Sequence, residues 1–251
     1  MNNTRHMHDH GIRHTDGLTY QSFDEYQLFV GNDRSNHDRE SHAAMDIAFG
    51  RAGNDHLSGG GMGDDLMGGA GNDQMAGSAG ADHLVGGSGN DRLTGGSEAD
   101  TLMGEDGNDY LNEGAGHGDI DGGPGNDILV GGLGADAFMI APDSGHDIIK
   151  DFVAGPGIFD HLAVMDVEPE QLRLHDTAAG VLIGWNTDNG DGSVLLEGVY
   201  KNDLYQNDFM FADDRHLMNP TDPTAHRVTA EHFVKDGGNE ASPAIPGQTA
   251  A

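Results

Sequence analysis

The stretch that decides the fold is Gly122-Gly123-Pro124-Gly125-Asn126-Asp127-Ile128-Leu129-Val130. It is the clearest copy of a nine-residue pattern, G-G-x-G-x-D-x-U-x with U apolar, that runs without a gap through residues 50–139. A short pattern repeated at a fixed period is typical of a solenoid, because each copy is one structural unit that buries its apolar side only against its neighbours. The repeat therefore predicts an all-β protein built around a stack of coils.

Two positions of the nine-residue frame carry most of the information. The eighth is apolar in every frame from Leu57 to Phe138, which predicts a single inward-facing row. The sixth is aspartate in every frame except one, where Gly118 stands in its place. The aspartates at this position are Asp55, Asp64, Asp73, Asp82, Asp91, Asp100, Asp109, Asp127 and Asp136.

Alternate frames differ at the fifth position, so the structural period is eighteen residues rather than nine. One set has asparagine there, as at Asn72 and Asn90, and the other has a small residue or histidine, as at Ala81 and His117. Two frames therefore make one coil of a parallel β-roll. Glycine permits the tight turns, and the last three residues of each frame are expected to form a short strand with the eighth side chain inward.

This arrangement matches the chemistry that calcium needs. Ca²⁺ takes about six to eight oxygen ligands in flexible geometry. A glycine-rich turn supplies backbone carbonyls and the aspartate at its end supplies a carboxylate, so ions are expected between coils about 4.8 Å apart. The sixth-position residues fall into two columns, Asp55, Asp73, Asp91, Asp109 and Asp127 in the first, and Asp64, Asp82, Asp100, Gly118 and Asp136 in the second.

The second column is expected to be the weaker one. Gly118 leaves a gap in it, since Asp119 is shifted by one residue and should point away. Met62 and Glu98 also replace the fourth-position glycine in two of its turns. Asp91→Ala is therefore expected to remove at least one bound calcium ion, and a substitution at Gly118 to remove none.

The frames resemble the repeats-in-toxin (RTX) family, the haemolysin-type calcium-binding repeat, over residues 50–139. That resemblance implies that turn carbonyls join the aspartates as calcium ligands. It also implies a secreted, extracellular protein exported by a one-step bacterial secretion system without an N-terminal signal. The turn glycines implicated in this way are Gly69, Gly71, Gly87, Gly89, Gly123 and Gly125.

Composition narrows the classes of partner. The formal net charge of −31 argues against nucleic acid and anionic membranes as partners. With 35% hydrophobic residues the supply for a buried core is small, and without cysteine no disulfide can compensate. Residues 1–17 contain no apolar run, so neither a cleavable signal peptide nor a membrane span is expected there.

Four segments are expected. Residues 1–45 form a partly flexible N-terminal segment with a strand at 26–30, and residues 46–140 form the roll. Residues 141–212 form a β-rich cap that resembles the one following such rolls in serralysin-like proteins, and residues 213–251 form a polar tail, either an export signal or a disordered end. The N-terminal histidines either bind a transition metal or belong to a solvated end: His6, His8, His10 and His14.

The sequence leaves more than one function open. No H-E-x-x-H or G-x-S-x-G motif occurs, and the segment before the roll is short for a catalytic domain. This favours a calcium-binding structural or interaction protein over an RTX-associated enzyme or a polysaccharide-binding or adhesin module. In one set of frames the outward ninth position is mainly apolar, with Met67, Val85, Met103, Asp121 and Met139. This stripe is expected either to be covered by the flanks or to contact a protein or polysaccharide partner.

Overall fold

The computed structural model describes residues 12–15, 18–22, 26–32, 34, 45–155, 159–205 and 208–211. The polar tail and His6, His8 and His10 lie outside these residues, and for His14 only the backbone is described. Within them nearly all regular structure is β, with one short 3-10 helix, η1 (Pro169–Gln171). No helix of the described part is long and apolar enough to cross a bilayer.

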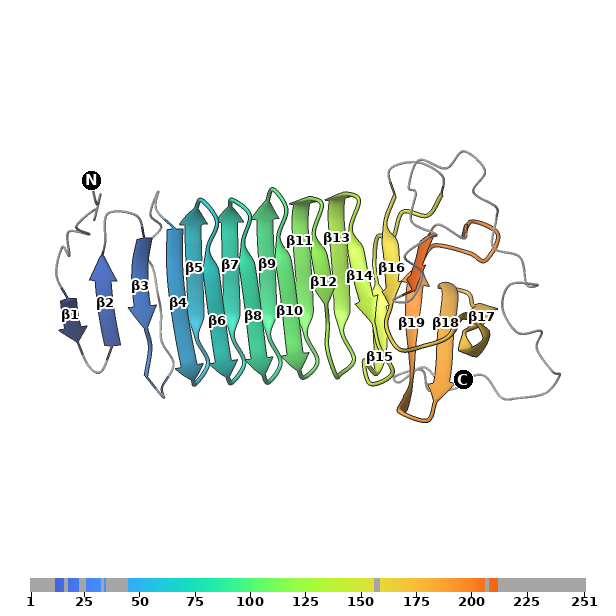
Figure 1. Ribbon diagram of the computed structural model, residues 1–251, viewed down its shortest axis with the longest axis horizontal. Helices are drawn as coiled ribbons and strands as arrows, with labels where there is room; N and C mark the ends of the chain where they lie inside the picture. The colour runs from blue at the N-terminus through green and yellow to red at the C-terminus, as the bar shows by residue number, and fades with distance from the viewer. Residues whose placement is uncertain are drawn as a thin grey trace, which may run out of the picture.

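The strands form two sheets that share the length of the molecule (Figure 1). The first sheet has the order β1 (Ile12–Thr15), β2 (Leu18–Ser22), β3 (Tyr26–Val30), β4 (Met45–Ala52), β6 (Asp65–Ala70), β8 (His83–Ser88), β10 (Thr101–Asp106), β12 (Asp119–Asp121), β14 (Ala137–Ile140), β16 (His161–Val164) and β20 (Phe209–Phe211). The second has the order β17 (Arg173–Asp176), β18 (Gly180–Thr187), β19 (Gly190–Glu197), β15 (His146–Ile149), β13 (Ile128–Gly134), β11 (Tyr110–Gly116), β9 (Arg92–Ser97), β7 (Gln74–Ala79) and β5 (His56–Gly61).

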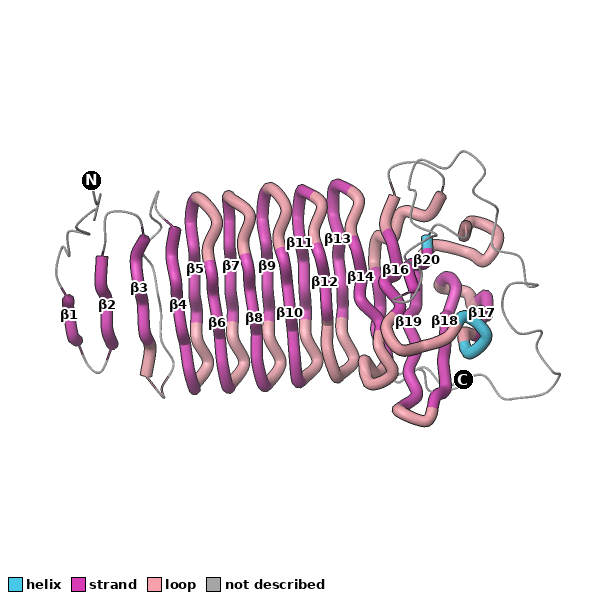
Figure 2. The backbone as a smooth tube through the Cα atoms, viewed as in Figure 1, coloured by secondary structure: helices cyan, strands magenta, loops and turns pink. Residues whose placement is uncertain are grey.

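The register within each sheet confirms the eighteen-residue coil. Leu66 on β6 is paired in parallel with Leu84 on β8, and Leu111 on β11 with Leu129 on β13. Successive frames alternate between the two sheets, and the glycine-rich turns lie along both edges of the roll (Figure 2). The predicted parallel β-roll is therefore confirmed.

Most strands of the roll are six residues long rather than the three expected, because they continue into the glycines of the next frame. Gly69 and Gly87, for example, still pair across β6 and β8. Both have positive φ, and a Cβ on Gly87 would lie 2.0 Å from the carbonyl oxygen of Gly69. Only glycine allows the backbones of neighbouring coils to approach so closely at this bend.

The core is a double row of single side chains. Every eighth-position residue from Leu57 to Phe138 is buried, and side chains before and after it point outward. Burying one such side chain contributes about 1.5–3 kcal/mol. Because each coil adds only two of them, the apolar core of the roll is thin.

Both ends of the roll continue into flanking strands. At one end β4 pairs with β3, which confirms the expected strand at 26–30. At the other end β15 extends the second sheet in parallel and is followed by the antiparallel hairpin β18–β19, while β16 and β20 extend the first sheet. Trp185 of the hairpin is buried, and its indole N–H donates to the carbonyl oxygen of Pro142 at 3.4 Å.

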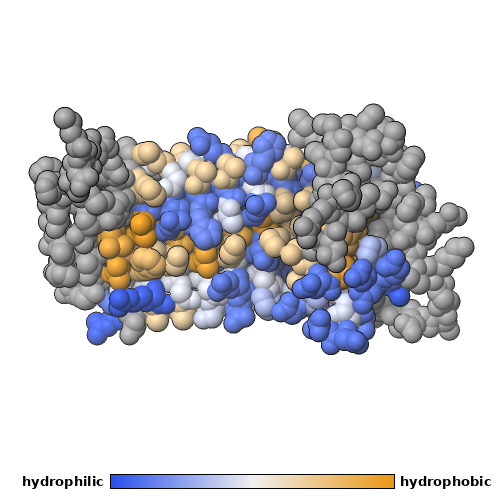
Figure 3. Space-filling view, viewed as in Figure 1, coloured by the Kyte–Doolittle hydropathy of each residue, from blue (hydrophilic) through white to orange (hydrophobic). Residues whose placement is uncertain are grey.

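The outer faces carry mixed side chains. Met67 is 38% exposed on the first sheet, and Val85, Met103 and Met139 lie half-buried in the same row. Asp121 lies in this row between Met103 and Met139. The expected outward direction of this stripe is confirmed. Apolar and polar residues both occur along the face of the roll that Figure 3 shows.

Candidate metal centre

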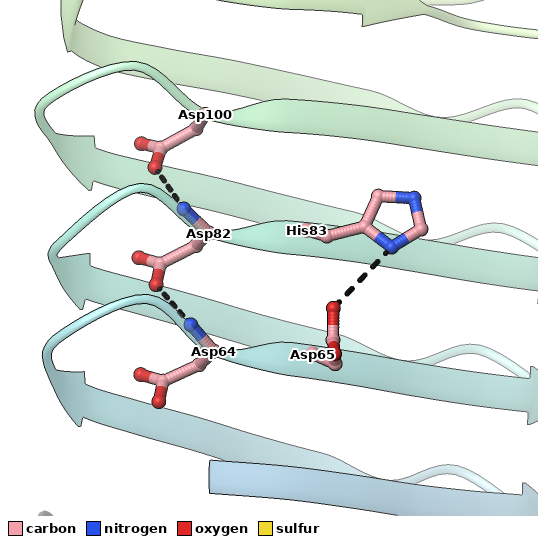
Figure 4. A network of polar contacts seen from close by, with 5 residues as sticks. All are labelled: Asp64, Asp65, Asp82, His83 and Asp100. Atoms are coloured by element: carbon pink, nitrogen blue, oxygen red, sulfur yellow. Dashed lines mark hydrogen bonds and ion pairs between the residues drawn. The ribbon is translucent and has the colours of Figure 1, made fainter. Parts of the chain in front are cut away.

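The sixth-position aspartates form two columns at the start of the strands. All nine are at most 3% exposed. In each column one carboxylate oxygen accepts the backbone N–H of the aspartate one coil earlier. Asp64 N–H donates to Asp82 Oδ1 at 2.8 Å and Asp82 N–H donates to Asp100 Oδ1 at 2.9 Å (Figure 4). In contrast, Asp65 and His83 point out from the strands that follow, 3.7 Å apart.

The first column repeats this geometry without interruption. Asp73 N–H donates to Asp91 Oδ1 at 2.8 Å, and Asp91 N–H donates to Asp109 Oδ1 at 2.7 Å. The prediction that aspartates eighteen residues apart lie one above the other is therefore confirmed for the first column. Asparagine makes a second ladder beside it, in which Asn90 N–H donates to Asn72 Oδ1 at 2.9 Å.

The second carboxylate oxygen of the columns has a different environment. It is fully buried and accepts no hydrogen bond from any of the residues that the structure describes. Leaving a buried polar atom unsatisfied typically costs about 1–3 kcal/mol, and more for a charged group, so a whole row of such atoms needs an explanation. This row consists of Oδ2 of Asp64, Asp73, Asp82, Asp91, Asp100, Asp109, Asp127 and Asp136.

Burial also disfavours the charged form of these groups. Desolvation raises the pKa of Asp73 and Asp91 from 3.8 to about 6, and that of Asp82 and Asp109 to about 7. The backbone N–H bonds oppose this rise, whereas neighbouring carboxylates of the same column add to it. A bound cation would reverse this balance, since an adjacent positive charge favours the carboxylate.

The turn glycines supply carbonyl oxygens close to the columns. A Cβ on Gly89 would lie 1.8 Å from the carbonyl oxygen of Gly71, and one on Gly125 would lie 1.6 Å from that of Gly107. These carbonyls therefore point along the roll toward the next turn. The predicted ligands Gly69, Gly71, Gly87, Gly89, Gly123 and Gly125 all lie in turns that lead to aspartates of the first column.

This donor set fits a hard cation that accepts backbone oxygens. Among the described residues, no three His, Cys, Asp or Glu side chains are grouped so that they could hold a metal ion by themselves. Most ligands would therefore be turn carbonyls, with the orphaned carboxylate oxygens completing the set. Calcium tolerates such mixed and irregular oxygen coordination, whereas magnesium requires near-octahedral geometry.

The non-glycine residues of the second column keep the turn geometry. Met62 and Glu98, at the fourth position, have φ of 83° and 81°. This is the left-handed region that glycine adopts more easily, so both residues are strained but leave the path of the chain intact. The weaker calcium binding expected at these two turns stays a prediction.

Three carboxylates that the sequence analysis did not include extend the columns. Asp46 N–H donates to Asp64 Oδ1 at 2.6 Å at the start of the roll. At its end, Asp127 N–H donates to Asp147 Oδ1 at 2.9 Å and Asp136 N–H donates to Asp160 Oδ1 at 3.0 Å.

Signals for these three residues existed in the sequence. Asp46 stands eighteen residues before Asp64. Asp147 and Asp160 each precede an apolar residue by two positions, as in the repeat, but at spacings of 20 and 24 residues. The longer connections hide them from a search at fixed period.

Another carboxylate lies beside Gly118, where the second column lacks an aspartate. The carboxylate of Glu113, from the first position of the same frame, occupies that place and is fully buried. Burial raises its pKa from 4.5 to about 7. Asp119 lies exposed on β12, as expected from its shift by one residue.

Comparison with known proteins agrees with this geometry. The family model of the RTX calcium-binding nonapeptide repeat (4 copies) matches residues 43–75, 58–93, 76–111, 85–120 and 114–138. This chain carries RTX calcium-binding repeats. The matched repeats coincide with the coils and their aspartate columns, so this part of the chain is a β-roll of RTX calcium-binding repeats.

Similarity beyond the RTX repeats is limited. No curated protein matches the sequence. Among solved structures, the chain is similar to the extracellular lipase LipA from Serratia marcescens, with 17% identity, a TM-score of 0.40, and coverage of 75% of this chain and 39% of the lipase. The chain thus spans well under half of the lipase, and so weak a likeness does not indicate a shared activity.

Proposed function

We propose that this chain is a secreted RTX protein whose roll folds when calcium binds and then acts as a structural or interaction module. The row of buried carboxylate oxygens without hydrogen-bond partners carries the proposal. Without a cation these desolvated groups oppose the folded state, and with one they become ligands. The same contacts therefore make folding depend on calcium.

The ligands in this proposal are the sixth-position aspartates and the turn carbonyls. Asp91 has coils on both sides, so its carboxylate is available to the spaces above and below it. The carbonyls of Gly69, Gly71, Gly87 and Gly89 line the turns that precede Asp73 and Asp91. Gly123 and Gly125 have the same relation to Asp127, although the Gly125 carbonyl also accepts the His146 N–H at 3.1 Å.

Weak calcium sites would suit a secreted protein. Calcium sites of extracellular modules have dissociation constants of about 10⁻⁴–10⁻³ M. Sites this weak would leave the chain unfolded during passage through a one-step exporter and fold it outside the cell. The RTX resemblance supports the same route.

An interaction role rests on the outer face of the first sheet. Its row of Met67, Val85, Met103 and Met139 is partly exposed, and methionine adapts readily to different partner surfaces. A protein or a polysaccharide is the proposed class of partner, since the charge of −31 disfavours nucleic acid and anionic membranes.

Far-ultraviolet circular dichroism of the full chain tests the proposal. We expect little β signal in excess EDTA and a large gain in millimolar calcium. Asp91→Asn keeps a hydrogen-bond acceptor but removes the charge, and should bind at least one ion fewer by calorimetry. Asp119→Asn, which changes an exposed carboxylate, is the matched control and should bind as the wild type does. A spectrum that EDTA leaves unchanged would refute calcium-dependent folding.

A further inference from the structure

A steric rule links the first and sixth positions of the RTX frame. A Cβ on Gly86 would lie 2.4 Å from Oδ2 of Asp91, and one on Gly95 would lie 2.2 Å from Oδ2 of Asp100. Real Cβ atoms do not approach so closely. The first position must therefore be glycine wherever the aspartate five residues later fills the space beside it.

The frame at residues 113–121 inverts this pair. Glu113 stands at the first position, where the other frames have glycine, and Gly118 stands at the sixth, where they have aspartate. A Cβ on Gly118 would lie 2.2 Å from Cγ of Glu113 and 2.9 Å from its Oε1. The glutamate side chain therefore fills the volume that an aspartate at position 118 would occupy, reaching it from the opposite side of the turn.

Glu113 also takes over the contacts of the missing aspartate. Its Oε1 accepts the backbone N–H of Asp100 at 3.5 Å, the donor that would otherwise bond to an aspartate at 118. The corresponding bond one coil earlier, from Asp82 N–H to Asp100 Oδ1, is 2.9 Å. Gly118 N–H still donates to Asp136 Oδ1 at 3.0 Å, so the ladder continues beyond the exchange.

The second carboxylate oxygen of Glu113, Oε2, independently indicates a role as a metal ligand. Glu113 is 0% exposed, and its Oε2 has no hydrogen-bond partner within the described part of the chain. This is the environment of Oδ2 in Asp100 and Asp136 on either side. A glutamate that served only to fill space would not need a buried, unsatisfied oxygen in register with theirs.

We propose that Glu113 is a calcium ligand that supplies, from the first position of its frame, the carboxylate that aspartate supplies from the sixth position elsewhere. The inference rests on the proposed calcium-dependent function of the columns. It makes the second column continuous from Asp64 to Asp136, so this column holds ions across the coil that lacks the motif aspartate. A search for the sixth-position aspartate alone undercounts the sites of this chain.

The first test compares Glu113→Gln with Asp119→Asn in the full chain by calcium calorimetry. Both changes remove one negative charge, but Asp119 is exposed on the outside of β12. Glutamine keeps the size of the side chain and an acceptor for the Asp100 N–H. We expect Glu113→Gln to bind at least one ion fewer and Asp119→Asn to bind the wild-type number. Wild-type binding by Glu113→Gln, in number and affinity, would overturn the proposal.

The second test rebuilds the usual frame. Glu113→Gly alone should lose at least one ion, and Glu113→Gly combined with Gly118→Asp should regain it, because the aspartate then has the room that glycine provides at the other nine first positions. If the double variant binds no more calcium than Glu113→Gly, the proposal that Glu113 replaces the sixth-position aspartate is wrong.

Asp91→Asn distinguishes calcium binding by the aspartate columns from the specific role of Glu113. If it loses calcium while Glu113→Gln does not, the column function stands and the role of Glu113 is wrong. If the wild type itself binds no calcium, both are wrong.

Discussion

At the scale of single residues, glycine in this chain acts mainly as reserved space. The first-position glycine leaves room for a carboxylate, and the second- and fourth-position glycines leave room for the carbonyl of the adjacent coil. The Glu113–Gly118 pair shows that what is required is one side chain in that space, from either end of the turn. The glycine at the first position and the aspartate at the sixth are therefore not independent, because the two positions share one volume that holds a single side chain.

This view predicts the effect of one methyl group. Gly86→Ala places a Cβ 2.4 Å from Asp91 Oδ2 and 2.7 Å from the carbonyl oxygen of Gly104. Overpacking of this kind typically costs about 1–3 kcal/mol, and displacement of Asp91 should also weaken calcium binding. Thermal melts in saturating calcium should show a lower Tm.

The matched control is Gly184→Ala on β18, where the nearest heavy atom to an added Cβ is 3.8 Å away. We expect its Tm to stay near the wild-type value. Equal melting of Gly86→Ala and wild type would contradict the steric rule.

At the scale of elements, two ladders tie each coil to its neighbours in opposite senses. Aspartate N–H groups donate to the carboxylate of the following coil, as from Asp73 to Asp91, whereas asparagine N–H groups donate to the side chain of the preceding coil, as from Asn90 to Asn72. In the second set of frames His117 takes the part of asparagine, because its Nδ1 accepts the Ala135 N–H at 2.9 Å. These bonds hold the coils in register and bring the carboxylates of each column close together.

That closeness predicts how the calcium-free roll responds to pH. The pKa of Asp91 is raised from 3.8 to about 6 and that of Asp109 to about 7, mainly by burial. The folded state therefore takes up protons at a higher pH than the unfolded chain does. Ionised buried carboxylates destabilise the calcium-free folded state most strongly above about pH 7. Protonation relieves this destabilisation as pH falls through about 7 to 4.

In EDTA, the far-ultraviolet β signal should accordingly rise as pH falls through that window, because protonation of the buried carboxylates favours the folded state. With calcium present the trend should reverse, because protons then compete with the cation for the carboxylates. A calcium-free β signal that falls between pH 7 and pH 5 would show that these carboxylates do not control stability.

At the scale of the whole molecule, a net charge of −31 is combined with a core only one side chain deep on each sheet. Typical domains retain about 5–15 kcal/mol of net stability. A site held at ten times its dissociation constant adds about 1.4 kcal/mol, so several sites together equal that amount. Calcium is therefore expected to supply much of the stability that hydrophobic burial supplies elsewhere.

This predicts a specific calcium titration. Tm should rise steadily with the logarithm of calcium concentration, because each ion binds the folded state alone. Sodium chloride at equal ionic strength only screens charge, and magnesium requires geometry that irregular turns do not provide, so both should raise Tm far less. Equal stabilisation by sodium chloride would indicate general screening instead of bound ions.

The sequence by itself determined the repeating part of this protein. Its eighteen-residue coil, its inward row from Leu57 to Phe138 and its first aspartate column follow from periodicity, because stacked identical units place equivalent residues in register. Only the tertiary structure decided where that periodicity fails. Asp147 and Asp160 join the columns because strand pairing aligns them across irregular connections. The Glu113 carboxylate lies where the column lacks one at Gly118, because side chains from these two positions would fill the same space. Such substitutions depend on which atoms share a volume, and that is a property of the folded backbone rather than of spacing along the chain.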